Sequence, residues 1–234
     1  MVSPRKISRC WEGEPCVVAA SGPSLTADVA HRVRMARWTG GWRVLCVNDA
    51  YRLLPRADAL YACDWSWWRY HQGAKSFDGE RWTSHSESTS LIDDKSQVAH
   101  EFDVNLVRAV DAAGFSSDQS FIHYGRPQAS SGFQAVNLAL LMGASKVVLI
   151  GFDGHAKNGK HFFGNHPEHL DRCGDEGYRD LARAFVADDR IVNATPGSSI
   201  EVYERVDLEE VLRDGSVHRH RPVADAGADQ CRTA

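Results

Sequence analysis

Four histidines lie in one short polar stretch of the chain, residues 154–174. They are His155, His161, His166 and His169. A neutral imidazole accepts a proton near pH 7, so this stretch suits a general base that activates a hydroxyl group. Zinc ligands and solvated loop histidines are the alternatives, but no pair follows the HExxH pattern and the nearby Cys173 is isolated. The composition therefore predicts a functional loop.

The second candidate is a tight turn with the sequence SGPSL at residues 21–25. Gly22 beside the fixed φ of Pro23 turns the chain sharply, and backbone N–H groups at a helix start suit a phosphate. The turn, which runs from Ser21 through Ser24, lacks the lysine of a Walker A loop and the GxGxxG spacing of a dinucleotide fold. The alternative is an ordinary strand-to-helix turn with Ser24 as the helix N-cap.

Polar residues also follow the other predicted strands or precede the most apolar predicted helix. Ligands of an open parallel sheet bind outside the carboxyl ends of its strands, although Asn and Asp are also common in turns. The resulting nucleotide-site candidates are Asn48, Asp49, Asp64, Ser130, Ser131, Gly132, Asp153 and Thr195. Arg126, in the segment YGRPQASSG, is a candidate catalytic cation at the same edge.

Short apolar runs alternate with helical patterns, and these elements must position the candidates. We predict strands at residues 16–20, 43–47, 59–62, 146–150 and 190–194, and helices at residues 25–36, 104–113, 130–142, 175–187 and 207–213. Continuous apolar strands separated by helices predict an α/β fold with a parallel sheet covered by helices on both faces.

The length of 234 residues, with 43% hydrophobic and 25% charged residues, predicts one core. We expect an N-terminal extension at residues 1–15, a single domain at residues 16–213 and a disordered tail at residues 214–234. The net charge of −4 disfavours nucleic acid as a partner unless a local basic groove exists. A homo-oligomer is an open alternative.

The cellular setting follows from what the chain does not contain. It has no run near the ~18 apolar residues of a membrane span and no secretory apolar core at its start. Its six cysteines show no CxxC spacing, which indicates buried free thiols. We therefore expect a cytoplasmic protein in a reducing compartment.

Three blocks of sequence carry a resemblance to a known family. They are VVAASGPSL at residues 17–25 with LCVNDAY at 45–51, SSGFQAVNLALLMGASKVVLIGFDGH at 130–155, and VNATPGSSI at 192–200. In order and strand context these blocks resemble the bacterial sialyltransferases of glycosyltransferase family 42. They also resemble the related DUF115 group, which includes archaeal hydroxymethylpterin diphosphokinases and phage proteins.

The resemblance implies a Rossmann-like, GT-A-variant sialyltransferase-like fold that binds a nucleotide without requiring a metal cofactor. It places Gly22, Pro23 and Ser24 by the phosphate, Asn48 near the nucleotide, Ser131 and Gly132 at its base or ribose, and Asp153 nearby. It also implies a lid over residues 154–174 whose histidine deprotonates the acceptor hydroxyl. The matching histidines are His161 and His166.

The chain departs from the family pattern in the turn and in the lid. Ser21 stands where the sialyltransferases have Asn, and Phe162 and Phe163 lie where they supply two tyrosines. Phenylalanine cannot donate a hydrogen bond to a departing phosphate, which argues against CMP-sialic acid as the donor.

The leading hypothesis is a glycosyltransferase that transfers a sugar from a nucleotide sugar, with a CMP-sugar as one candidate, to an unknown acceptor. The first alternative is pyrophosphoryl transfer from ATP, with Mg²⁺ bound by Asp64 or Asp153. The second alternative is a non-catalytic nucleotide-binding phage accessory protein.

Overall fold

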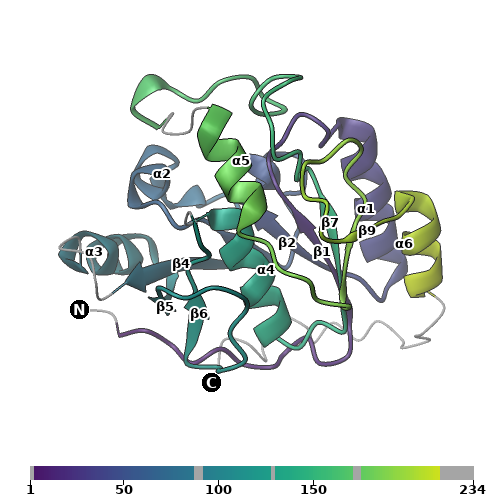
Figure 1. Cartoon of the computed structure of the whole chain (residues 1–234). Coiled ribbons are helices and arrows are strands. Elements are labelled where there is room, and N and C mark those ends of the chain that lie inside the picture. Colours follow the sequence, from purple (N-terminus) through teal and green to yellow (C-terminus); the bar gives the residue numbers. More distant parts are fainter. Residues whose placement is uncertain (1–2, 87–91, 128–129, 171–174, 217–234) are drawn as a thin grey trace.

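The protein forms one parallel sheet, described by a computed structural model at residues 3–86, 92–127, 130–170 and 175–216 (Figure 1). Its strands are β1 (Pro15–Ala19), β2 (Arg43–Val47), β3 (Ala59–Tyr61), β4 (Glu80–Ser86), β5 (Asn105–Val110), β6 (Phe121–His123), β7 (Lys146–Ile150), β8 (Ile191–Asn193) and β9 (Glu204–Arg205). Among the described residues the strand order is β6-β5-β4-β3-β2-β1-β7-β8-β9, and every neighbouring pair is parallel.

Helices cover both faces of the sheet. They are α1 (Ala27–Thr39), α2 (Trp65–Tyr70), α3 (Ile92–Phe102), α4 (Ser131–Leu141), α5 (Asp175–Arg183) and α6 (Leu208–Ser216), with short 3₁₀ turns η1 (Asn48–Arg52), η2 (Gln72–Ala74) and η3 (Glu168–Leu170). Alternate strand residues point to opposite faces, so Val18 packs with α4 while Val17 packs with α1, α2 and α6. The expectation of a two-sided α/β sheet is confirmed.

The direction of the chain reverses between β1 and β7. The chain runs outward from β1 to β6, returns across the sheet through α4, and enters β7 on the other side of β1. In an open parallel sheet a ligand crevice forms outside the carboxyl ends at such a switch point. In Figure 1 this edge of the sheet lies beneath the loop that precedes α5.

All five predicted strands are present, but the prediction of a helix at residues 104–113 is wrong. β5 occupies that segment, paired with β4 and β6. Val107 and Ala109 are buried on one face of this strand, while on the other face Leu106 is buried and Arg108 is exposed. The last helix also extends beyond its predicted end at residue 213, to Ser216.

The segment before β1 packs against the domain. Ile7 and Trp11 are buried in the same core as α4, and the Ile7 N–H donates to the carbonyl oxygen of Gln119 at 2.8 Å. Cys16, Cys46 and Cys63 are free thiols, but Cys10 is disulfide-bonded. The expectation of six free thiols is therefore wrong for Cys10. The predicted tail lies beyond the described residues from residue 217 onward.

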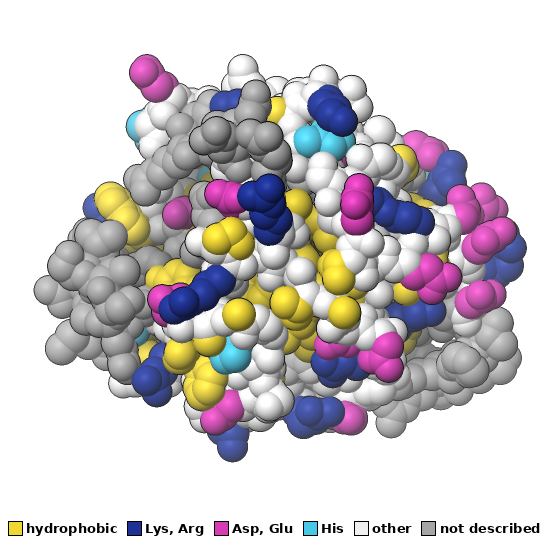
Figure 2. Space-filling view, viewed as in Figure 1, with side chains coloured by type: hydrophobic (Ala, Val, Ile, Leu, Met, Phe, Trp, Pro, Cys, Tyr) yellow, Lys and Arg dark blue, Asp and Glu magenta, His cyan; other side chains and the backbone are white. Residues whose placement is uncertain are grey.

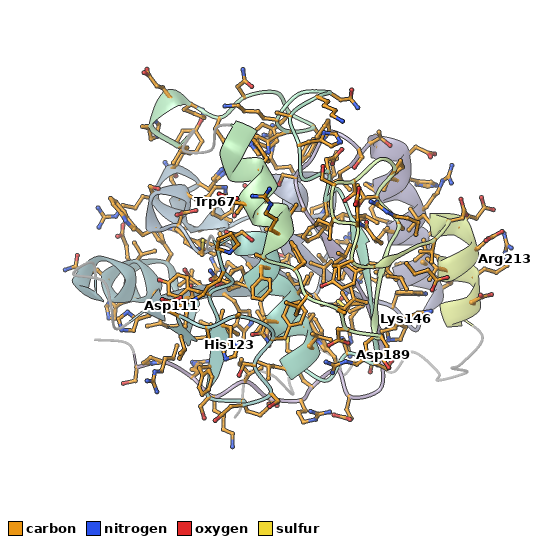
Figure 3. The ribbon with its side chains drawn as sticks, in the orientation of Figure 1. Trp67, Asp111, His123, Lys146, Asp189 and Arg213 are labelled. Atoms are coloured by element: carbon orange, nitrogen blue, oxygen red, sulfur yellow. The ribbon has the colours of Figure 1, made fainter. Side chains whose placement is uncertain are left out.

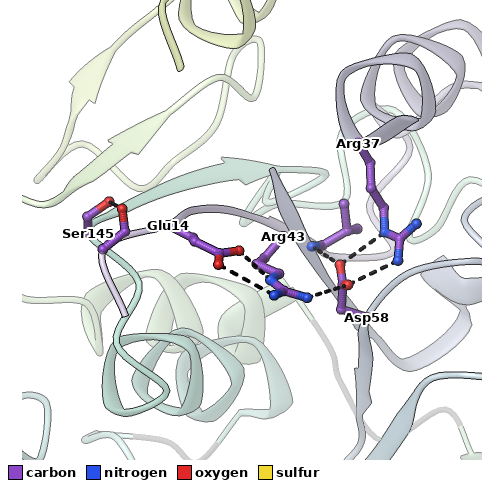
Figure 4. Close-up of polar contacts among 7 residues, drawn as sticks. Glu14, Arg37, Arg43, Asp58 and Ser145 are labelled. Atoms are coloured by element: carbon purple, nitrogen blue, oxygen red, sulfur yellow. Dashed lines mark hydrogen bonds and ion pairs between the residues drawn. The ribbon is translucent and has the colours of Figure 1, made fainter. Parts of the chain in front are cut away.

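Asp58 gathers charges and a backbone donor at the amino edge of the sheet, away from the switch-point crevice (Figure 4). Its carboxylate accepts two hydrogen bonds of 3.0 Å from Arg37, one of 3.2 Å from Arg43 and one of 2.8 Å from the Val44 N–H. Arg43 also pairs with Glu14, just before β1. This network ties α1, β1 and β2 together.

Replacing Asp58 with alanine should lower the free energy of unfolding by about 2–4 kcal/mol, since it leaves a buried N–H and two cations without their shared acceptor. The matched control is Asp111→Ala. Its carboxylate pairs with Arg126 in two hydrogen bonds of 2.9 Å but is 60% exposed, so the cost should stay below about 1 kcal/mol. Urea unfolding monitored by tryptophan fluorescence measures both, and equal losses would contradict the role given to Asp58.

Candidate functional site

Two turns meet at the switch point, one after β1 and one after β7. The Gly22 N–H donates to the Gly151 carbonyl oxygen at 3.0 Å. A Cβ on Gly22 would overlap the Asp153 carboxylate and lie 2.5 Å from the Gly151 oxygen, so only glycine fits this contact. Gly151 adopts φ +69°, and a Cβ there would overlap the Ala20 carbonyl oxygen. The backbones of the two turns are in direct contact.

The turn after β1 uses its N–H groups within the protein. Ser24 donates its hydroxyl to Asp153 Oδ2 at 2.7 Å, and its N–H points to the same oxygen at 3.4 Å. The N–H groups of Leu25 and Thr26 donate to carbonyl oxygens of the turn itself at 3.0 Å. Helix α1 begins only at Ala27, with Thr26 rather than Ser24 as its N-cap. The turn is therefore not the open set of donors that the sequence suggests.

A cavity of about 160 Å³ opens beside these turns, many times the ~10–15 Å³ that holds one water molecule. Eight of the predicted site residues line it: Ser21, Gly22, Asn48, Ser130, Ser131, Gly132, Asp153 and His161. They come from five separate segments of the chain. The sheet topology brings together residues that are up to 140 positions apart.

Asn48 has an unusual backbone and an unpaired side-chain oxygen. Its φ of +50° lies in the left-handed region, and the Oδ1 atom is buried without a hydrogen-bond partner in the structure. Strained backbone and unpaired buried polar atoms concentrate at ligand sites. Among the predicted residues, Asn48 is the one whose backbone and side chain best fit a residue of a ligand site.

The start of α4 forms another wall of the cavity. Ser130 is the N-cap, and its hydroxyl accepts the Phe133 N–H at 3.0 Å. The Ser131 hydroxyl accepts the Cys63 N–H and approaches the Cys63 thiol, both at 3.1 Å. Gly132 contacts the ring of Phe152, where a Cβ would lie 2.9 Å from the nearest ring carbon. Both serine hydroxyls therefore have structural partners while they face the cavity.

Phenylalanines anchor the histidine loop, which we define as residues 154–170. The Phe162 N–H donates to the Ser21 carbonyl oxygen at 3.0 Å, and its side chain packs against the core on the α1 face. The Arg52 guanidinium lies 5.4 Å from the centre of the Phe163 ring. Figure 1 shows the loop above the carboxyl edge of the sheet.

Phe163 also orders the two predicted base residues. Its ring stacks on His161 with 4.9 Å between centroids and 3° between planes. The His166 ring lies 4.5 Å from the His161 ring, but it is not among the residues that line the cavity. His161 is therefore the better placed of the two histidines.

His155 lines the cavity as well, but its ring is already engaged. Its Nδ1 accepts the Lys157 N–H at 3.3 Å, and its Nε2 lies 3.0 Å from the Gly197 carbonyl oxygen, so the neutral ring carries its proton on Nε2. Both ring nitrogens of His155 therefore have hydrogen-bond partners within the protein.

Asp49 is buried beside the site instead of lining it. Its carboxylate accepts the Trp67 indole N–H at 2.8 Å and lies 3.5 Å from His71 Nε2. Burial raises the pKa of Asp49, but the nearby His71 imidazole and the Trp67 hydrogen bond outweigh burial and hold the pKa below its usual range. Figure 3 shows Trp67 toward the carboxyl edge, with Lys146 at the opposite edge.

The remaining predicted residues also lie outside the cavity lining. Thr195 is buried, where its hydroxyl accepts the Phe152 N–H at 3.1 Å and so joins the strand ends. Asp64 is exposed at the start of α2. Arg126 is held by Asp111 at an exposed position. Pro23, Ser24 and His166 are likewise absent from the described lining.

The cavity lining also contains a cation, a hydroxyl group and an apolar wall that were not predicted from the sequence. Lys160, next to His161, and Tyr178 of α5 line the cavity, together with the apolar side chains Val47, Phe152, Leu181, Ala182, Phe185 and Ile200. Figure 2 shows apolar side chains gathered around α5 on this face. The adjacency of Lys160 to a candidate base was a readable signal, whereas the position of Tyr178 depends on how α5 packs.

Neither a protein-family model nor a curated protein matches this chain. Among solved structures it is similar to the structure of MAf glycosyltransferase from Magnetospirillum magneticum AMB-1, with a TM-score of 0.52 and 14% identity. The match covers 93% of this chain and 38% of that one. The fold is glycosyltransferase-like. This degree of similarity establishes shared architecture alone, and the present chain spans well under half of the matched protein.

The described residues contain neither a membrane-spanning helix nor a group of metal ligands. No helix there is long and apolar enough to cross a membrane. No group of three or more His, Cys, Asp or Glu side chains in that part of the chain is arranged to hold a metal ion.

Gly22→Ala should lower the free energy of unfolding by about 3 kcal/mol or more, because a Cβ overlaps fixed groups of the second turn. Gly132→Ala is the comparison, since its Cβ would meet only the edge of the Phe152 ring, which can rotate away at smaller cost. Chemical denaturation of both variants gives the answer. A Gly22→Ala protein as stable as the parent would show that the turns do not pack as described.

Asp49→Asn should destabilise the protein by about 1–2 kcal/mol at neutral pH. Because the folded pKa of Asp49 is depressed, its charge stabilises the fold above the unfolded pKa, and this contribution disappears as pH falls below about 4. The stability difference between parent and variant should therefore shrink between pH 5 and pH 3. Asp78→Asn, at an exposed position before β4, should show little difference at any pH.

Proposed function

We propose that this chain is the nucleotide-binding catalytic domain of a glycosyltransferase that uses no metal and takes His161 as its general base. The observation that carries the proposal is the cavity at the switch point, which brings together Asn48, Ser131 and His161 from three distant segments. A nucleotide sugar would occupy it, with a CMP-sugar among the candidates.

The reaction needs one proton acceptor and one leaving group. His161 would take the proton of the acceptor hydroxyl as its oxygen attacks the anomeric carbon of the sugar. The bond from that carbon to the phosphate oxygen breaks, and the nucleotide leaves with the electron pair. The stacked ring of Phe163 supports this role because it restricts rotation of the imidazole.

Several features support nucleotide recognition at this cavity. The unpaired Asn48 Oδ1 can accept a hydrogen bond from a base or ribose, and the apolar wall offers a surface for a flat ring. The glycosyltransferase-like fold agrees with this use of the site. The same proposal includes four further points. The protein would belong to family 42, come from a phage, lie in the cytoplasm and form a homo-oligomer.

A thermal-shift screen against CMP, CDP, UDP, GDP, ADP and ATP tests the donor class, because a ligand selective for the native state raises the melting temperature. We expect a pyrimidine nucleotide to raise it equally in EDTA and in Mg²⁺. A shift with ATP and Mg²⁺ alone would favour pyrophosphoryl transfer, and no shift with any nucleotide would reject the proposal.

With the donor identified, His161→Gln should reduce sugar transfer by about 10²-fold or more while leaving nucleotide affinity within about threefold. The matched control is His31→Gln, at an exposed position on α1 away from the cavity, which should retain full activity. An active His161→Gln enzyme with the parental pH profile would exclude this histidine as the base. Loss of nucleotide binding in that variant would instead indicate a role in binding.

A further inference from the structure

The turn after β1 is poorly arranged to receive a phosphate. Its N–H groups at Gly22, Ser24, Leu25 and Thr26 already donate to acceptors of the protein, and Pro23 has no N–H. An anion there would have to displace these bonds. The first residues of α1, which could supply further donors, are exposed and lie outside the cavity lining.

The charge beside the turn is also of the wrong sign. The Asp153 carboxylate is 4% exposed, contacts Gly22 and accepts both Ser24 hydrogen bonds on Oδ2. A phosphate placed against this turn would meet a buried carboxylate at close range, where repulsion is weakly screened. The phosphate of a bound nucleotide therefore needs a different wall.

The histidine loop and α5 provide the complementary wall. Lys160 is the only lysine or arginine among the described residues that line the cavity, and Tyr178 adds a phenolic hydroxyl from α5. The loop that carries Lys160 is fixed in place by the Phe162 N–H bond to Ser21 and by the burial of the Phe162 ring. A cation on an anchored loop is preorganised for an anion.

We infer that Lys160 and Tyr178 form the phosphate subsite of the nucleotide, and that the turn at residues 21–25 is a structural joint. This inference rests on the proposed nucleotide function and assigns the role of leaving-group stabiliser. Lys160 supplies positive charge and Tyr178 a hydrogen bond as charge develops on the departing phosphate.

Calorimetric titration of the full chain in EDTA tests this assignment with pairs of ligands that differ only in phosphate. The pairs are cytidine with CMP and uridine with UDP. In the parent protein the nucleotide should bind more tightly than its nucleoside. Lys160→Gln should weaken nucleotide binding by at least about tenfold and leave nucleoside binding unchanged, whereas Lys160→Arg should retain most of the affinity.

Two further variants separate the subsite from general effects of the loop. Lys157→Gln removes a lysine from an exposed position of the same loop and should bind both members of each pair like the parent. Tyr178→Phe should weaken nucleotide binding by about three- to tenfold without affecting the nucleoside.

The outcomes distinguish this inference from the function on which it rests. If Lys160→Gln binds the nucleotide as tightly as the parent does, the subsite is overturned and the nucleotide function stands. The same holds if Lys160→Gln loses equal affinity for the nucleoside and the nucleotide. A parent protein that binds neither member of either pair, and no other nucleotide of the thermal-shift screen, would overturn both.

Discussion

The close approach of two backbone turns at the switch point is the constraint on which the site depends. Gly22 and Gly151 allow this approach because neither carries a Cβ, and the Asp153 carboxylate fills the space beside Gly22 and binds Ser24. Any larger residue at these positions would push β1 and β7 apart at their carboxyl ends. The cavity exists where it does because these two turns take up so little space.

The histidine loop, which forms another wall of the cavity, is attached to this pair of turns. The Ser21 carbonyl oxygen accepts the Phe162 N–H, so the joint holds the histidine loop directly. The loop in turn presents Lys160 and His161 to the cavity, while Phe163 stacks on His161. Phe162 attaches the loop to the domain and Phe163 stacks on His161, while Tyr178 of α5 lines the same cavity.

Polar groups at the two edges of the sheet differ in how completely they are hydrogen-bonded. At the amino edge the Asp58 carboxylate accepts hydrogen bonds from two arginines and a backbone N–H, so these groups already have partners within the protein (Figure 4). At the carboxyl edge Asn48 keeps a strained backbone and an unpaired buried oxygen. Unpaired polar atoms are costly, so an unpaired atom on a strained residue that lines a cavity marks a place suited to a ligand.

The sequence by itself determined the α/β class, because runs such as Val44–Val47 are apolar throughout and only a parallel sheet covered on both faces buries every residue of such a run. It also predicted a ligand edge from the polar residues that follow these strands, and several of these residues line the cavity. It misassigned β5, whose mixed polarity does not distinguish a strand near the sheet edge from a helix. Only the tertiary structure decided that His161 faces the cavity, that Asp49 is buried beneath Trp67 and that Tyr178 joins the site, because these placements depend on contacts between residues far apart in the chain.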